Sequence, residues 1–214
     1  MIKFIEQKNI NKKKWDACIS KSADASVFVY SWYLDVVCES WVALVLNDYE
    51  AVFPMAEKSK YKISYLYQPF FTRYFGVYSQ TKITESIVAE FLQAIPEKYK
   101  LMEFCLHEQN GLKAKGFDVK EKKYQLLDLK KNNETLRKNY SENAKRNIKK
   151  AIKAGLTIRP DILPEKVVSL FRETKGDELE VFKAEDYKIL IRLMNVCIEN
   201  NKGQSVAIYD GAEL

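Results

Sequence analysis

The chain has 214 residues, of which 47% are hydrophobic and 30% are charged, and its net charge is +6. This composition excludes an intrinsically disordered chain, which would contain far fewer apolar residues. No apolar run reaches the roughly 18 residues that a membrane-spanning helix needs, and the N-terminus lacks the apolar stretch of a signal peptide. We therefore expect a cytoplasmic globular protein without a membrane span.

The predicted elements alternate between helices and strands. Apolar residues at helical spacing predict a helix after the possible cap Asn11, a second from Ser31 to about Cys38, and a third that ends near Pro96. Asn47-Asp48 predicts a tight hairpin connection between the first two strands. Strands are predicted at 41–46, 49–57, 63–67, 101–106 and 123–129.

The pattern continues with a long helix from about Asn133 to Ala154, where Gly155 is a natural C-terminal cap. Beyond it we predict strands at 156–159 and 205–209 and helices at 164–174 and 184–200. Only three residues follow the turn Asp210-Gly211, too few for a second hairpin strand. We therefore expect the natural protein to continue beyond Leu214.

Several kinds of active site are excluded by residues that the sequence lacks. His107 is the only histidine, so one chain cannot form a multi-histidine metal site. The four cysteines are widely spaced, which fits neither a zinc knuckle nor a redox Cys-x-x-Cys pair. Glycine-rich phosphate-binding loops are absent as well. We expect no metal and no permanently bound cofactor.

Aromatic residues are concentrated between Tyr61 and Tyr78. Because side chains alternate along a strand, Tyr61, Tyr65 and Tyr67 are predicted to share one face. Two interpretations stay open: a cleft wall that holds an acyl chain, sugar or base, or a tyrosine-rich core edge or interface, which is the commoner arrangement. Gln68 and Arg73 interrupt the aromatic run and favour a site.

Basic residues are concentrated between Asn132 and Lys153, which carry seven cations against two acidic residues. An apolar stripe at helical spacing predicts that one face is a buried seam and that the cations point to water. A solvated charged face and the recognition of a phosphate-bearing ligand or nucleic acid are equally open. The stripe consists of Leu136, Tyr140, Ala144, Ile148 and Ala151.

A third candidate is the start of the helix at Ser31. Ser31 is predicted to be its N-cap, with Trp32 in the first turn. Backbone N–H groups there could hold an anion below a stacking Trp32. The alternative is a capped helix that packs Trp32 and Leu34 inward.

Three segments resemble the FemABX-type branch of the GNAT acyltransferase superfamily, especially the FemAB-like proteins common in Bacteroidetes. The first is Phe-Val-Tyr-Ser-Trp-Tyr-Leu-Asp at 28–35. The second is Tyr-Leu-Tyr-Gln-Pro-Phe-Phe at 65–71, together with Phe-Gly-Val at 75–77. The third, at 139–151, contains an Arg-Asn-Ile-x-Lys-Ala core.

The resemblance implies an α/β (α+β) fold in which helices flank a GNAT-like mixed, mostly antiparallel sheet. Residues 1–131 would form a first GNAT-like domain, 132–154 a basic linker helix, and 155–214 the incomplete beginning of a second GNAT-like domain. Characterised relatives transfer an amino acid from aminoacyl-tRNA to an amine of a peptidoglycan precursor, and GNAT relatives use acyl-coenzyme A. Either compound would be the co-substrate.

We therefore expect an acyltransferase that moves an acyl or aminoacyl group onto an amine, with a cell-wall precursor as one acceptor. Such a reaction needs no covalent nucleophile, so few His and Cys residues suffice. Tyr67 and Gln68 are the catalytic candidates, and Arg146, Lys149 and Lys150 would contact phosphates of a nucleotide-linked substrate or tRNA. The substrate-binding candidates are Trp32, Tyr65, Tyr67, Gln68, Arg73, Arg146, Lys149 and Lys150.

Two alternatives compete with this function. One is a non-enzymatic module that binds RNA or a partner protein through the basic helix and the aromatic segment. The other is an acetyl-coenzyme A-dependent N-acetyltransferase with a small-molecule acceptor.

Overall fold

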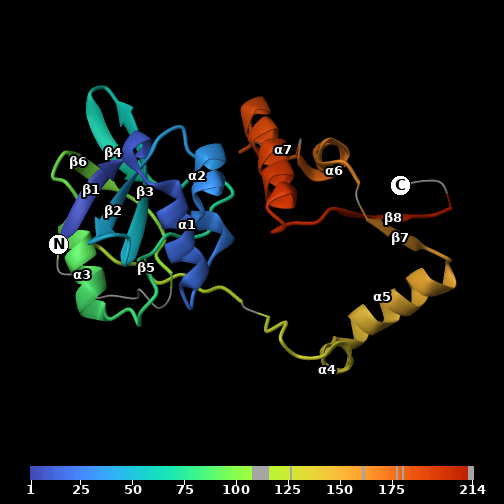
Figure 1. The fold of residues 1–214 in the computed structure, drawn as a ribbon. Helices are drawn as coiled ribbons and strands as arrows, with labels where there is room; N and C mark the ends of the chain where they lie inside the picture. The colour runs from blue at the N-terminus through green and yellow to red at the C-terminus, as the bar shows by residue number, and fades with distance from the viewer. Residues whose placement is uncertain (108–115, 126, 161, 177, 180, 212–214) are drawn as a thin grey trace. The chain divides into compact units, whose positions relative to one another are not determined.

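The computed structural model describes residues 1–107, 116–125, 127–160, 162–176, 178–179 and 181–211 (Figure 1). The chain divides into two compact units. The first consists of residues 1–119 and 168–203, and the second of residues 120–167 and 204–214. The domain boundaries expected at 131 and 154 stay a prediction.

A six-stranded sheet lies at the centre of the first unit (Figure 1). Its order is β1-β2-β3-β4-β6, and β5 pairs with β3. All pairs are antiparallel except β4 with β6, which is parallel, so the predicted mixed and mostly antiparallel sheet is confirmed. The strands are β1 (Ile2–Glu6), β2 (Trp41–Leu46), β3 (Ala51–Lys60), β4 (Ile63–Tyr67), β5 (Tyr78–Ser79) and β6 (Tyr99–Met102).

Helices flank this sheet, and the hydrophobic core lies between the helices and the sheet. Asn11 is the N-cap of α1, as predicted, because its Oδ1 accepts a hydrogen bond from Lys14 N at 3.1 Å. Trp15 of α1 and Trp41 of β2 are fully buried, with ring centroids 5.1 Å apart. The helices are α1 (Lys12–Lys21), α2 (Ser31–Val37), α3 (Glu85–Gln93) and α7 (Ala184–Glu199), and α7 packs against α2. Short helices at Gln7–Asn9 and Val27–Val29 and a π-helix at Arg172–Gly176 complete the unit.

Three local predictions for this unit are wrong. The connection between β2 and β3 is a four-residue loop, Asn47–Glu50, and not a two-residue turn. Tyr61 does not lie in a strand, since it forms the β3–β4 turn with Lys62, and both have positive φ. The strand expected at 101–106 ends at Met102, and beyond it Leu106 forms an isolated bridge with Phe75.

The second unit contains two short helices and a two-stranded ribbon. They are α4 (Asn133–Lys138), α5 (Glu142–Lys153), β7 (Thr157–Pro160) and β8 (Val206–Tyr209), which pairs antiparallel with β7. The described residues between 120 and 129 form no strand, so the strand predicted at 123–129 is wrong; residue 126 lies outside the described residues. Helix α6 (Pro164–Phe171) spans the boundary between the two units.

The long helix predicted from Asn133 to Ala154 is interrupted. It breaks between α4 and α5, where Ser141 Oγ accepts a hydrogen bond from Ala144 N at 3.2 Å and caps a new helix. The predicted cap at Gly155 is confirmed: its φ is +75°, and its N–H donates to Ile152 O at 3.1 Å.

The apolar stripe of this segment is not a buried seam. No described residue of α4 or α5 is buried, and two residues of the stripe, Tyr140 and Ile148, are 41% and 44% exposed. Prediction and structure differ because helical periodicity identifies an apolar face without identifying what covers it. In the described part of the chain, no helix has the length and apolar character needed to cross a membrane.

Candidate functional site

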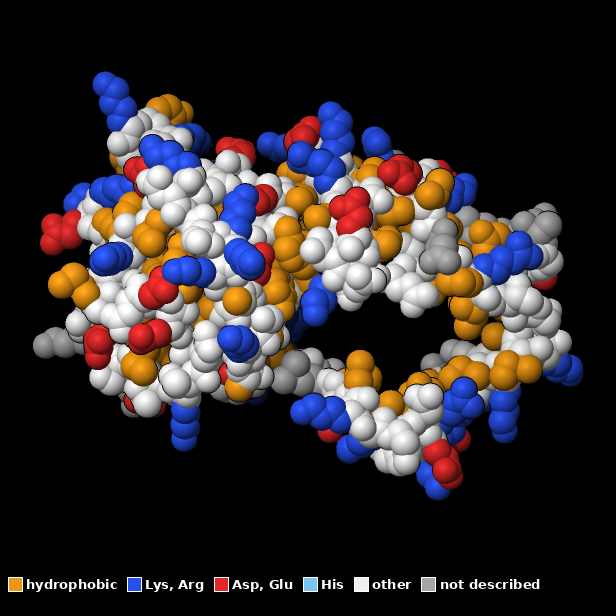
Figure 2. Space-filling view, in the orientation of Figure 1, with side chains coloured by type: hydrophobic (Ala, Val, Ile, Leu, Met, Phe, Trp, Pro, Cys, Tyr) orange, Lys and Arg blue, Asp and Glu red, His pale blue; other side chains and the backbone are white. Residues whose placement is uncertain are grey.

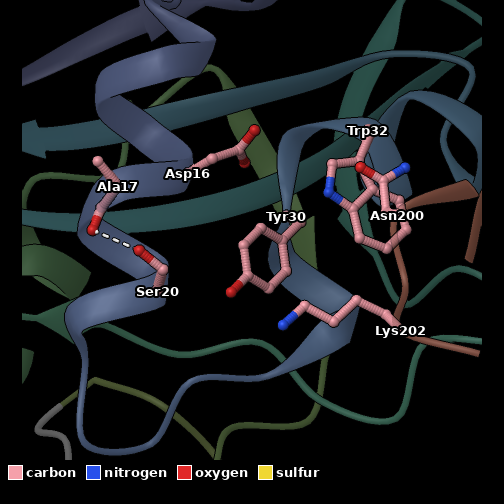
Figure 3. A pocket seen from close by; sticks show the side chains of 7 residues that line it. All are labelled: Asp16, Ala17, Ser20, Tyr30, Trp32, Asn200 and Lys202. Carbon is pink, nitrogen blue, oxygen red and sulfur yellow. Dashed lines mark hydrogen bonds between the residues drawn. The ribbon is translucent and has the colours of Figure 1, made fainter.

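A shallow pocket of about 430 Å³ lies in the first unit, between α1, the start of α2 and the segment that follows α7 (Figure 3). It includes Trp32, one of the predicted substrate-binding residues. The complete lining is Asp16, Ala17, Ser20, Tyr30, Trp32, Asn200 and Lys202.

Aromatic rings and a cation form one part of this pocket. The rings of Tyr30 and Trp32 are stacked, with centroids 5.6 Å apart and an interplanar angle of 20°. Lys202 Nζ lies 5.7 Å from the centroid of the Tyr30 ring, within the range of a cation–π contact. Since Lys202 forms no ion pair with the described residues, its charge is available to an anionic ligand.

Asp16 supplies the carboxylate of the pocket. Its Oδ1 accepts from Ser31 N at 2.7 Å, and its Oδ2 accepts from Ser31 Oγ at 2.8 Å. Burial raises the pKa of Asp16, and the two hydrogen bonds from Ser31 oppose that rise. The carboxylate therefore has a higher affinity for a proton than an exposed aspartate has.

These contacts correct the prediction for the start of α2. Tyr30, not Ser31, is the N-cap, and its side chain makes no capping hydrogen bond. The N–H of Ser31, which was expected to be available to an anion, already donates to Asp16. Trp32 is half-buried against the core and also lines the pocket, so its predicted inward packing is confirmed in part, and its stacking on a ligand stays a prediction.

The hydroxyl of Tyr30 stays protonated at neutral pH. Burial raises the pKa of Tyr30, and the nearby charge of Asp16 raises it further. A neutral phenol can both donate and accept a hydrogen bond.

Tyr65 and Tyr67 do not line this pocket. They lie on one face of β4, as predicted, with ring centroids 6.2 Å apart. Lys58 Nζ lies 4.8 Å from the centroid of the Tyr67 ring. Burial raises the pKa of Tyr67, and the proximity of Cys38 and Glu39 adds to that rise. The catalytic role of Tyr67 stays a prediction.

Gln68 uses both ends of its amide within the protein. Its Oε1 accepts from Cys105 N at 2.9 Å, and its Nε2 donates to Thr72 O at 3.0 Å. These bonds connect the loop after β4 to the segment after β6. Gln68 therefore has a structural role, and its catalytic role stays a prediction. Substrate binding by Arg73, which is exposed, also stays a prediction.

Arg146, Lys149 and Lys150 belong to α5 in the second unit and are all exposed. The guanidinium of Arg146 donates to Asn143 Oδ1 at 3.0 Å. Among the described residues, none of the three forms an ion pair, whereas Lys145 pairs with Glu142 at 2.8 Å. Their charge is therefore available to phosphate groups.

Of the residues that line the pocket, sequence reasoning identified only Trp32, and it missed Asp16, Tyr30, Asn200 and Lys202. Asp16 follows the buried Trp15 in an ordinary amphipathic helix, which gives no signal of a site. Asn200 and Lys202 are far from Trp32 in the sequence and reach it only because α7 packs against α2.

Within the described ranges, no cluster of three or more His, Cys, Asp or Glu side chains could hold a metal ion. The sequence matches no family model, no curated protein and no solved structure.

Proposed function

We propose that the protein is an acyltransferase of the GNAT or FemABX type, which moves an acyl or aminoacyl group onto an amine. The observation that carries this proposal is the pocket of the first unit, where stacked rings of Tyr30 and Trp32 lie with the Asp16 carboxylate and the Lys202 ammonium. The resemblance of segments 28–35, 65–71 and 139–151 and the mixed, mostly antiparallel sheet also support it.

These groups suit the chemistry of acyl transfer. The amine nitrogen attacks the carbonyl carbon of an ester or thioester, and the C–O or C–S bond breaks. The proton of the amine passes to a base and then to the leaving oxygen or sulfur. Asp16, whose pKa is raised by burial, is our candidate for that base. Lys202 would stabilise the developing oxyanion.

The donor would be an acyl-coenzyme A or an aminoacyl-tRNA. Both compounds carry phosphates. Lys202 of the pocket would attract such groups, and the exposed cations Arg146, Lys149 and Lys150 would do so separately in the second unit. A cell-wall precursor with a free amine is the acceptor class that the resemblance implies. Its amine, in the ammonium form, would be attracted to the ring faces and to the carboxylate of the pocket, and it would release one proton to solvent to become the neutral amine that attacks.

A fluorescence titration tests this proposal. The chain has three tryptophans, and Trp15 and Trp41 are fully buried, so a ligand in the pocket would chiefly alter the emission of Trp32. The compounds are acetyl-coenzyme A, an aminoacyl-tRNA and a UDP-linked peptidoglycan precursor. We expect at least one to change the emission saturably, and mass spectrometry to detect an acylated amine when donor and acceptor are both present.

The variant Lys202→Met distinguishes binding in the pocket from nonspecific attraction of anions to a basic protein. Removing this ammonium should weaken binding of an anionic pocket ligand about tenfold. Lys82→Met is the matched control, since Lys82 is another exposed lysine of the first unit. Equal affinities of the two variants, or unchanged Trp32 emission with every compound, would contradict the proposal.

A second candidate, an RNA-binding module without catalysis, is favoured by Arg146, Lys149 and Lys150 of α5, which form no ion pair with the described residues. Replacing both Arg146 and Lys149 by Ala should then lower the affinity for RNA. It should also make the plot of log affinity against log salt concentration less steep, by the amount that about two phosphate contacts contribute. RNA binding without any acylated product would favour this candidate over the acyltransferase.

A further inference from the structure

The end of the β3–β4 hairpin has no neighbouring strand among the described residues. β2 pairs with β3 only as far as Ala56, and β6 pairs with β4 only from Ser64 onward. Residues 59–63 therefore extend beyond the adjacent strands, as Figure 1 shows. This end of the hairpin is accessible to a partner on several sides.

Apolar side chains are exposed at this end. Tyr61 is 87% exposed, Ile63 is 53% exposed, and Leu101 of the neighbouring β6 is 61% exposed. Leu101 pairs with Tyr65, and residues two apart on a strand share a face, so Ile63, Tyr65 and Leu101 lie on the same face of the sheet. We call Tyr61, Ile63 and Leu101 the hairpin patch.

Lysines adjacent in sequence to the hairpin patch form no ion pair with the described residues, and one of them, Lys60, has its Nζ 5.3 Å from the centroid of the Tyr61 ring. Lys58 and Lys98 are paired, the first with Glu39 at 3.2 Å and the second with Glu57 at 3.6 Å. In contrast, three lysines next to patch residues in the sequence form no ion pair with any described residue. These are Lys60, Lys62 and Lys100. Figure 2 shows basic and hydrophobic side chains together at this end of the molecule.

We propose that the hairpin patch docks on an anionic lipid bilayer. Tyrosine and aliphatic side chains would enter the boundary between headgroups and acyl chains, and the lysines would meet the anionic headgroups. Two of the three patch residues, Ile63 and Leu101, are aliphatic. They gain free energy on transfer to a hydrocarbon environment but cannot stack on bases, which favours a bilayer over single-stranded RNA.

Sedimentation with vesicles tests this proposal on the full chain. Vesicles of phosphatidylcholine with phosphatidylglycerol should sediment the protein, and vesicles of phosphatidylcholine alone should sediment much less of it. The double variant Tyr61→Ser, Ile63→Ser should lower the partition coefficient about tenfold or more. Val181→Ser is the matched control, because Val181 is also exposed in the first unit, and it should leave the partition unchanged.

A second measurement separates insertion from simple electrostatic attraction, which the lysines of α5 could also provide. In the variant Tyr61→Trp, lipids that carry a nitroxide near the headgroup should quench the new tryptophan. The same quenching should persist after Lys149→Glu in α5. Absence of quenching, or equal sedimentation of the double serine variant and the native chain, would overturn the proposal.

The RNA alternative is one further outcome. If a uridine oligonucleotide binds the native chain, and the double serine variant loses that binding while its vesicle sedimentation is unchanged, the partner is RNA and the lipid proposal is wrong. The vesicle measurements use no donor or acceptor, so they do not depend on whether the protein is an acyltransferase.

Discussion

The carboxylate of Asp16 accepts two hydrogen bonds from Ser31, one from the backbone N–H at 2.7 Å and one from the hydroxyl at 2.8 Å. This contact joins α1 to the first turn of α2, and both helices contribute to the pocket. It also satisfies one of the N–H groups that a helix start leaves without a partner in the helix. The pocket and the packing of α1 on α2 therefore depend on the same pair.

The first prediction concerns the stability that this pair provides. Asp16→Ala should lower the free energy of unfolding by about 2 kcal/mol, because the buried N–H and hydroxyl of Ser31 lose their acceptor. Ser31→Ala, which removes only one hydrogen bond, should cost about 1 kcal/mol. Urea denaturation followed by circular dichroism measures both.

The control for this pair is Asp48→Ala, since Asp48 is an exposed residue whose ion pair with Lys14 should contribute less than about 1 kcal/mol. An Asp16→Ala variant no less stable than Asp48→Ala would show that the contact between Asp16 and Ser31 does not stabilise the unit.

The second prediction concerns acid denaturation and Asp35. Burial alone would raise the pKa of Asp35, but hydrogen bonds from Lys12, Trp41 and Gln7 outweigh it and lower the pKa. Because folding lowers the pKa of Asp35, this carboxylate stabilises the protein at pH values above its pKa in the unfolded chain, which is about 4. That stabilisation is lost as the pH falls through the pKa that Asp35 has in the folded protein.

Asp35→Asn should therefore destabilise the protein at pH 7 and make its stability less sensitive to pH below about 4. Urea denaturation at a series of pH values measures this slope. Identical slopes for Asp35→Asn and the native chain would show that folding does not lower the pKa of Asp35.

Much of the first unit could be predicted from local sequence. The strands at 41–46 and 63–67 have the predicted bounds, because β-branched and aromatic residues there are bounded by turn residues. Two caps were predicted as well, Asn11 in the first unit and Gly155 in the second, since capping depends on residues close in sequence.

The rest depends on contacts that local sequence does not encode. The break at 139–141 was missed because the apolar repeat continues across it, although Ser141 is an ordinary N-cap residue. Lys202 was missed because only the packing of α7 on α2 brings it near Tyr30. Asp16 was missed because α1 gives no local signal of a site, and only its hydrogen bonds to Ser31 show that it lies beside the start of α2.

The third prediction separates the structural and catalytic interpretations of Gln68. Gln68→Ala removes the hydrogen bonds to Cys105 N and Thr72 O, so it should lower the free energy of unfolding by about 1 to 2 kcal/mol. At a temperature where the variant is fully folded, ligand-induced changes in Trp32 emission and the rate of acyl transfer should match those of the native chain. A fall in the rate without a fall in stability would instead support a catalytic Gln68.

The last prediction concerns the C-terminal end of α5. Gly155 has a φ of +75°, and no atom lies within 4 Å of the position that a Cβ would occupy, so backbone strain and not a steric clash determines the effect of substitution. Gly155→Ala should lower the free energy of unfolding of the second unit by about 1 kcal/mol, and Gly155→Asn by less, because asparagine tolerates a positive φ better. Hydrogen exchange of the amides of α5 measures the effect on this unit alone.

Ala154→Gly is the matched control, because Ala154 has an ordinary helical φ of −75° and the change tests only added backbone freedom. Equal exchange rates for Gly155→Ala and the native chain would show that the left-handed cap does not stabilise the helix.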